Sequence, residues 1–135
     1  MAAAGRSNTF SIPITPPIFL LAQIASHYQT EALDEFIESM NTMGVKIPAI
    51  YGVFYYRSAN TRTCSVLSQF FPVPFEQLKH DFDSGVPAAE VCARSIHALL
   101  QRGVKHVYIS NLPMATAAKK FSEIESRVEE MLVVR

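Results

Sequence analysis

The sequence predicts an α/β fold with parallel strands, built from three strand–helix units. Short, continuous apolar runs at residues 18–23, 47–54 and 104–110 are typical of strands buried on both faces. Each run is followed by one or more segments in which apolar residues recur at helical spacing. Strands that alternate with helices in this way predict one parallel sheet with right-handed crossovers.

The first unit covers residues 18–44. Its apolar run ends in Gln23, and Thr30 is the expected N-cap of the following helix, because its hydroxyl can accept a bond from a free backbone N–H. Gly44 is typical of the end of a helix. The apolar residues at helical spacing are Leu33, Phe36, Ile37 and Met40.

The second unit starts with the strand at residues 47–54. Asn60 or Thr61 is expected to cap the next helix. The prolines within residues 72–74 end that helix, because proline lacks a backbone donor. A further short helix is expected at residues 75–82.

The third unit is preceded by a turn at residues 81–85, which is rich in Asp, Ser and Gly. Pro87 suits the first turn of a longer helix that ends at Gly103. The third strand then covers residues 104–110, and the last helix residues 115–132.

The composition is that of a folded chain without strong charge. Of its 135 residues, 49% are hydrophobic and 18% are charged, against about 25% charged in an average soluble protein. Intrinsic disorder requires the opposite balance and is excluded for the chain as a whole. The 12 basic and 12 acidic residues give a net charge of zero, which argues against binding to nucleic acid.

No segment predicts insertion into a membrane. The most apolar run, residues 18–25, is far shorter than the ~20 residues that a membrane-spanning helix needs. Cys64 and Cys92 lack the spacing of a metal site or a disulfide framework, which indicates a reducing, cytoplasmic location. Residues 1–15 are expected to be disordered or extended, and residues 16–135 to form the domain.

Candidate ligand-binding residues lie at the carboxyl ends of the predicted strands, where parallel α/β folds bind ligands. The first strand ends at Gln23, whose amide can bond the edge of a heterocycle; the alternative is that it only ends a strand. The second strand ends in aromatic residues that include Tyr55, which can stack on a ligand or pack at the rim of the fold. The third ends at the polar pair Ser110 and Asn111.

No short motif names a reaction. The four histidines are scattered, and His27, which follows the first strand, is expected to lie in a solvated loop. The sequence contains no H-E-x-x-H, Walker, G-x-G-x-x-G or G-x-S-x-G pattern. The residues alone therefore leave the activity open.

Four short runs follow one another in an order and spacing shared with a known family. They are Phe-Leu-Leu-Ala-Gln at 19–23, Met-Gly-Val-Lys-Ile-Pro at 43–48, Ile-Tyr-Gly-Val-Phe at 50–54 and Asn-Leu-Pro-Met at 111–114. The chain resembles the 5,10-methylenetetrahydrofolate reductase family over about residues 16–124. That family has an apolar strand ending in Gln, a helix ending in Gly, then Ile-Pro-Gly-Ile and Thr-Leu-Asn-Arg in the same order.

The resemblance implies the last three units of a (β/α)8 barrel. It also implies an enzyme that reduces 5,10-methylenetetrahydrofolate to 5-methyltetrahydrofolate with FAD and a reduced nicotinamide, NAD(P)H. Gln23 matches the family's glutamine that hydrogen-bonds the pterin. Together with the strand-end residues above, the expected substrate-binding set is Gln23, Tyr55 and Asn111.

The chain also departs from the family. Ser110 and Met114 stand where the family has a substrate-contacting tyrosine and an arginine, and methionine lacks the charge and the donors of a guanidinium. The family's catalytic acid and most of its FAD contacts belong to five earlier units that no part of this chain matches. The chain is therefore expected to be inactive alone.

Two hypotheses follow. The chain supplies the pterin-binding part of a folate enzyme, or it is a non-catalytic partial barrel that acts as a scaffold or a partner subunit. In both cases an apolar sheet of only three strands has open edges, which favours self-association or a companion chain.

Overall fold

The computed structural model describes residues 19–133, and the expectation for residues 1–15 lies outside them. The described chain is an α/β fold with a sheet of three parallel strands and five α-helices, which confirms the predicted class. The strands are β1 (Leu20–Ile24), β2 (Ala49–Phe54) and β3 (His106–Ser110). The helices are α2 (Thr30–Thr42), α3 (Thr61–Leu67), α4 (Phe75–Asp83), α5 (Ala88–Gln101) and α6 (Ala117–Val133), with short 3-10 turns at His27–Gln29 and Met114–Thr116.

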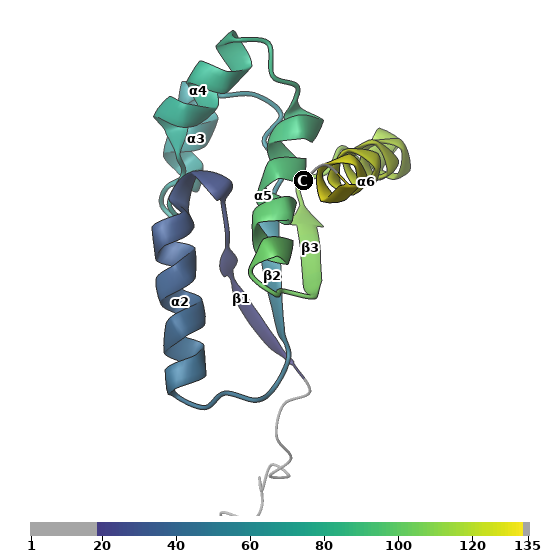
Figure 1. The fold of residues 1–135 in the computed structure, drawn as a ribbon. Helices are drawn as coiled ribbons and strands as arrows, with labels where there is room; N and C mark the ends of the chain where they lie inside the picture. Colours follow the sequence, from purple (N-terminus) through teal and green to yellow (C-terminus); the bar gives the residue numbers. More distant parts are fainter. Residues whose placement is uncertain (1–18, 134–135) are drawn as a thin grey trace, which may run out of the picture.

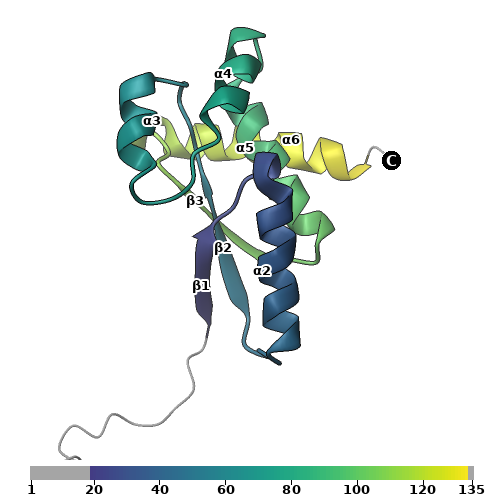
Figure 2. The same cartoon turned by 90° about the vertical axis from the view of Figure 1, so that its left-hand side faces the viewer.

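The strands lie side by side in sequence order, β1-β2-β3. Helix α2 connects β1 to β2, and α3, α4 and α5 lie between β2 and β3 in the chain. Figure 2 shows the strands on one side of the molecule with α2 and α5 beside them on the other. In Figure 1, α3 and α4 lie above the sheet, at the end toward which the strands run.

Helices α2, α5 and α6 pack on one face of the sheet, because all three contribute to the same apolar core. Along β2 the side chains of Tyr51 and Val53 enter this core. Their partners on β3 are Val107 and Ile109, so the inward positions of the two strands match. Fully buried side chains at its centre are Val53, Cys92, Leu99 and Ile124.

Most of the opposite face of the sheet is open among the described residues; only its carboxyl end is covered, where Phe54 of β2 packs in a cluster with Leu67 of α3. Leu21 is 61% exposed and Tyr108 is 39% exposed there. The prediction that the strands are buried on both faces is therefore wrong within residues 19–133. A continuous apolar run is compatible with one covered and one open face, since hydrophobicity alone does not say what packs on each face.

Tyr108 crosses its neighbouring strand on this open face. A Cβ atom placed on Gly52 would come within 2.6 Å of the Tyr108 ring and 2.8 Å of Ile24 Cδ1. Gly52 is paired directly with Tyr108, and because glycine has no side chain, the Tyr108 ring can lie over it.

Several helix ends agree with the sequence analysis. Asn60 caps α3 by accepting a hydrogen bond from the Thr63 N–H at 2.9 Å. Gly44 and Gly103 adopt left-handed φ angles of 71° and 84° after α2 and α5, as expected for residues that end helices.

Other boundaries differ. Thr30 is not the cap of a free helix end but the first residue of α2, because the 3-10 turn at His27–Gln29 runs directly into it. Ser26 caps that turn by accepting a bond from the Tyr28 N–H at 3.1 Å. The predicted turn at residues 81–85 begins later, because α4 continues to Asp83.

Candidate functional site

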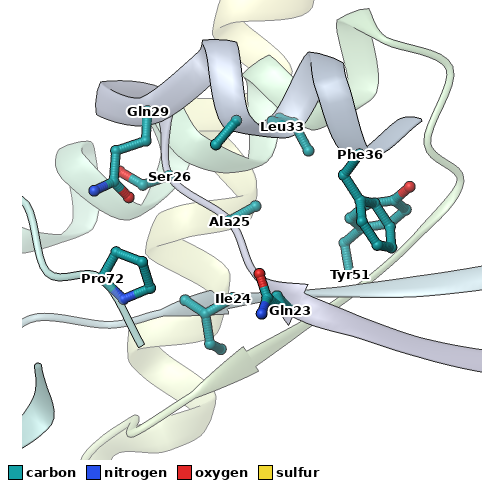
Figure 3. Close-up of a pocket in the computed structure, with 10 residues that line it drawn as sticks. Gln23, Ile24, Ala25, Ser26, Gln29, Leu33, Phe36, Tyr51 and Pro72 are labelled. Carbon is teal, nitrogen blue, oxygen red and sulfur yellow. The ribbon is translucent and has the colours of Figure 1, made fainter. Parts of the chain in front are cut away.

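Gln23 lies at the carboxyl end of β1 and lines a pocket of about 240 Å³, here called the Gln23 pocket. Leu33 and Phe36 of α2 form one wall, and Pro72, from the connection between α3 and α4, contributes from the other side. Figure 3 shows the Gln23 amide between Pro72 and the pair formed by Phe36 and Tyr51. The last two rings meet edge to face with centroids 6.0 Å apart.

The Gln23 pocket is mostly apolar, with a few polar groups at its edge. Burial raises the pKa of the Tyr51 hydroxyl, so this group stays neutral near neutral pH. The Gln23 side chain is exposed, and none of the hydrogen bonds among residues 19–133 uses its amide. Its donors and its acceptor are therefore available to a ligand in this pocket.

Tyr55 does not lie in the Gln23 pocket. It is only 3% exposed and belongs to the apolar core between the sheet and the helices. Its backbone N–H donates to the Ser110 carbonyl at 2.8 Å, which extends the pairing of β2 with β3 by one residue. The aromatic ring of Tyr55 thus packs in this core.

Asn111 holds the end of β3 to the end of β2. Its φ angle is 75°, in the left-handed region that few residues other than glycine adopt. Its side-chain amide donates to the Tyr55 carbonyl at 3.0 Å, which leaves the second N–H and the amide oxygen for other partners. The side chain thus ties two strand ends together.

Asn111 also borders a second pocket, of about 270 Å³, at the carboxyl ends of β2 and β3; we call it the β2–β3 pocket. Phe54 and Tyr56, the neighbours of Tyr55 in the sequence, line it. The predicted set is therefore divided: Gln23 lies in one pocket, Asn111 in another, and Tyr55 in the core.

Replacing Asn111 with alanine is expected to destabilise the fold by about 1–2 kcal/mol. The substitution removes the bond to the Tyr55 carbonyl, and alanine adopts a left-handed φ less readily than asparagine does. Asn111→Gly keeps the backbone freedom and loses only the bond, so its loss should be smaller. Urea unfolding of both variants measures the difference. Equal stability of Asn111→Ala and the parent chain would show that the hydrogen bond from Asn111 to the Tyr55 carbonyl does not stabilise the fold.

His27 is not in a solvated loop, contrary to the sequence prediction. Its backbone N–H donates to Ser95 Oγ at 3.1 Å, and its Nδ1 lies 2.8 Å from the same oxygen. A neutral ring with its proton on Nε2 lets the Ser95 hydroxyl donate to Nδ1 and accept from the His27 N–H. Nε2 is then a buried donor without a partner among the described residues.

The ring of His27 is held neutral by its surroundings. Burial, and then the positive charge of Arg94, lower its pKa to about 4, although Asp81 and Glu90 act in the opposite direction. Ser95 was the available signal in the sequence: a hydroxyl on the apolar side of a long helix needs a partner when that side is buried.

A charged network surrounds this pair. The Tyr28 hydroxyl donates to Asp81, and burial, followed by this bond, raises the pKa of Tyr28. Arg94 lies 3.7 Å from Asp81 and 3.1 Å from Glu90. Arg127 of α6 also reaches Glu90, at 3.0 Å, so α4, α5 and α6 are connected through ion pairs.

Cys64 and Cys92 are free and buried. Burial raises the pKa of the Cys92 thiol to about 12 and also raises that of Cys64. Because the thiolate is the reactive form, neither cysteine is activated as a nucleophile.

The two pockets at the carboxyl end of the sheet are small. Pockets that enclose whole ligands are about 300–1,000 Å³, so neither the Gln23 pocket nor the β2–β3 pocket fits a whole FAD molecule. Within residues 19–133, no three His, Cys, Asp or Glu side chains are grouped to hold a metal ion. In the same part of the chain, no helix combines the length and apolar character needed to cross a membrane.

Comparison with known proteins leaves the chain without an assigned family: no protein-family model matches it, and no curated protein matches it.

Proposed function

We propose that the chain supplies three consecutive βα units of a (β/α)8 barrel of the 5,10-methylenetetrahydrofolate reductase type. In such barrels the strands follow in sequence order, with helices outside and strand side chains inside. The order β1-β2-β3 and the helices on one face of the sheet support this proposal. The open face that carries Leu21 and Tyr108 corresponds to the inside of the barrel.

Gln23 is the residue to which we assign recognition of the pterin. The single observation that supports this role is the free amide at the carboxyl end of β1, on the edge of an apolar pocket. One amide offers both donors and an acceptor, which complement the edge of a pterin ring. In this proposal Gln23 binds and orients the folate, and the chain acts in the cytoplasm on one-carbon metabolism.

The Gln23 assignment predicts a loss of folate binding in Gln23→Leu. We expect affinity for 5-methyltetrahydrofolate to fall by about 1–3 kcal/mol, because the pterin edge would lose its partner on burial. Calorimetric titration of the chain measures this loss. Gln77→Leu, on the exposed side of α4, removes the same group elsewhere and should bind as the parent does. If Gln23→Leu binds 5-methyltetrahydrofolate as tightly as the parent chain does, Gln23 has no role in binding and only ends the strand.

FAD and NAD(P)H belong to the complete enzyme in this proposal. In that enzyme the flavin would supply the hydride for reduction of the folate. Because the Gln23 pocket and the β2–β3 pocket do not fit FAD, we assign FAD binding to the other units of the barrel. We therefore expect the purified chain to show no flavin absorbance and no NADH oxidation. A flavin absorbance band that NADH bleaches would contradict this expectation.

A second candidate function is a non-catalytic scaffold or partner subunit. It is favoured by the two outer edges of the sheet, since β1 and β3 each pair with one strand only within residues 19–133. Exposed parallel edges pair readily with other chains. Light scattering is expected to report a mass above the 15.0 kDa of one chain. A stable monomer at high concentration would argue against this function and against an incomplete barrel.

A further inference from the structure

The β2–β3 pocket differs from the Gln23 pocket in its chemistry. Two aromatic rings stand at its wall: those of Phe54 and Tyr56, whose centroids are 4.9 Å apart. Phe71 packs behind Phe54 at 5.3 Å, which holds this ring in place. Tyr56 is only 7% exposed and packs in a cluster with Leu78 and Val91, so the half-buried ring of Phe54 is the main aromatic surface that this pocket offers to a planar ligand.

Among residues 19–133, Arg57 is the only charged residue that lines this pocket. Burial raises the pKa values of the Tyr56 hydroxyl and the Cys64 thiol, so neither group adds a negative charge near neutral pH. The pocket consequently combines an aromatic wall with a single positive charge.

The guanidinium of Arg57 has no carboxylate partner among residues 19–133. In the same part of the chain Arg94, Arg102 and Arg127 form ion pairs with acidic side chains, whereas the exposed Arg62 of α3, like Arg57, forms none. Arg57 instead donates from one Nη atom to the backbone carbonyl of Asn111 at 3.4 Å. Most of its five N–H donors are free for an anion.

Asn111 is the residue that Arg57 contacts at the end of β3. The carbonyl that accepts from Arg57 belongs to a residue whose own side chain is bonded to the Tyr55 carbonyl. This long contact keeps the guanidinium close to the end of β3, where Arg57 lines the pocket.

We propose that the β2–β3 pocket binds a small aromatic carboxylate, with its ring against Phe54 and its carboxylate paired with Arg57. The planar guanidinium bonds a carboxylate through two parallel N–H groups. A single guanidinium balances the single charge of a carboxylate, whereas a phosphate dianion would keep an unpaired charge. The volume of about 270 Å³ suits a one-ring acid. This site is separate from the Gln23 pocket and does not depend on folate chemistry.

Benzoate is the probe that tests this inference, with benzamide as its neutral counterpart. Saturation-transfer NMR with the whole chain is expected to show binding of benzoate and a much weaker signal for benzamide. Equal binding of the two compounds, stronger binding of phenyl phosphate than of benzoate, or no binding of benzoate would each overturn the proposal.

Variants then locate the site. Arg57→Gln is expected to weaken benzoate binding about ten-fold, as for the loss of a charge-assisted bond at a partly exposed position. Arg57→Lys should keep part of the affinity, because the charge remains and the paired N–H groups are lost. Arg62→Gln, an exposed α3 arginine that does not line the pocket, is the matched control and should bind as the parent does.

Two further outcomes are decisive. Unchanged benzoate binding in Arg57→Gln would contradict the site even if benzoate binds elsewhere. Gln23→Leu should leave benzoate binding unchanged, so a failure of the folate proposal and a failure of this one give different results. Thermal unfolding of each variant confirms that the exposed substitutions leave the fold intact.

Discussion

Replacing Leu99 with alanine is expected to lower the free energy of unfolding by about 3 kcal/mol, since fully buried leucines lose both transfer energy and packing when they are truncated. Leu99 has no exposed surface and lies on α5, in the core cluster that joins the sheet to α2 and α6. Domains of ordinary stability unfold with about 5–15 kcal/mol. A loss of this size would therefore remove a large part of the free energy of unfolding.

Urea unfolding followed by circular dichroism measures this effect. Leu132→Ala is the matched control, because the same atoms are removed from a position on α6 that is 43% exposed. We expect the control to lose about 1 kcal/mol or less. Equal losses in the two variants would mean that α5 is not the centre of the core.

Acid is expected to destabilise the chain through His27. In the unfolded chain this histidine takes up a proton near its ordinary pKa of 6.5, whereas in the fold its pKa is about 4. The unfolded state therefore binds more protons between these values, and stability that is present above pH ~6.5 is lost as the pH falls toward ~4. Because the half-buried ring is partly screened by solvent, we expect a loss of about 1–2 kcal/mol.

The comparison of free energies of unfolding at neutral and mildly acidic pH tests this effect. His27→Gln cannot be protonated and should reduce the difference between the two conditions. His80→Gln removes an exposed histidine of α4 that lies outside the pair with Ser95, and serves as the control. The same acid-induced loss in His27→Gln and the parent would assign the effect to other groups.

The elements of this fold were predictable because each has a strong local signal. β2 is a continuous apolar run, and α5 combines apolar periodicity with a glycine that ends it at a positive φ. Parallel order followed from the alternation of strands with helices. What covers the second face of the sheet was not encoded locally, since the same apolar run serves a strand covered on one face or on both.

The candidate site was predicted less completely. Gln23 lines a pocket, as expected for a polar residue at the end of an apolar strand. The sequence offers three consecutive aromatic residues there. Tyr55 lies in the core between the sheet and the helices, whereas Phe54 and Tyr56 belong to a second apolar cluster and border the β2–β3 pocket. Successive side chains of an extended segment point to opposite sides, and the sequence does not state which side is inward.

The sequence places His27 just after the first strand, which predicts a solvated loop histidine. Its partner Ser95 is 68 residues away, on a helix that the fold brings against the turn after β1. The cap at Ser26 and the bond to Ser95 together form that turn, which is why α2 starts without a free N-cap at Thr30. Long-range pairs of this kind cannot be found from local spacing.

The two edge strands of the sheet, β1 and β3, differ in how regularly they pair with β2. The register between these strands shifts between Leu21 and Ile24, whereas β3 pairs with β2 without interruption from His106 to Ser110. A bulged strand is a poor template for a new neighbour, and a regular one is a good template. An added strand is thus expected to join more readily at the regular β3 edge than at the bulged β1 edge.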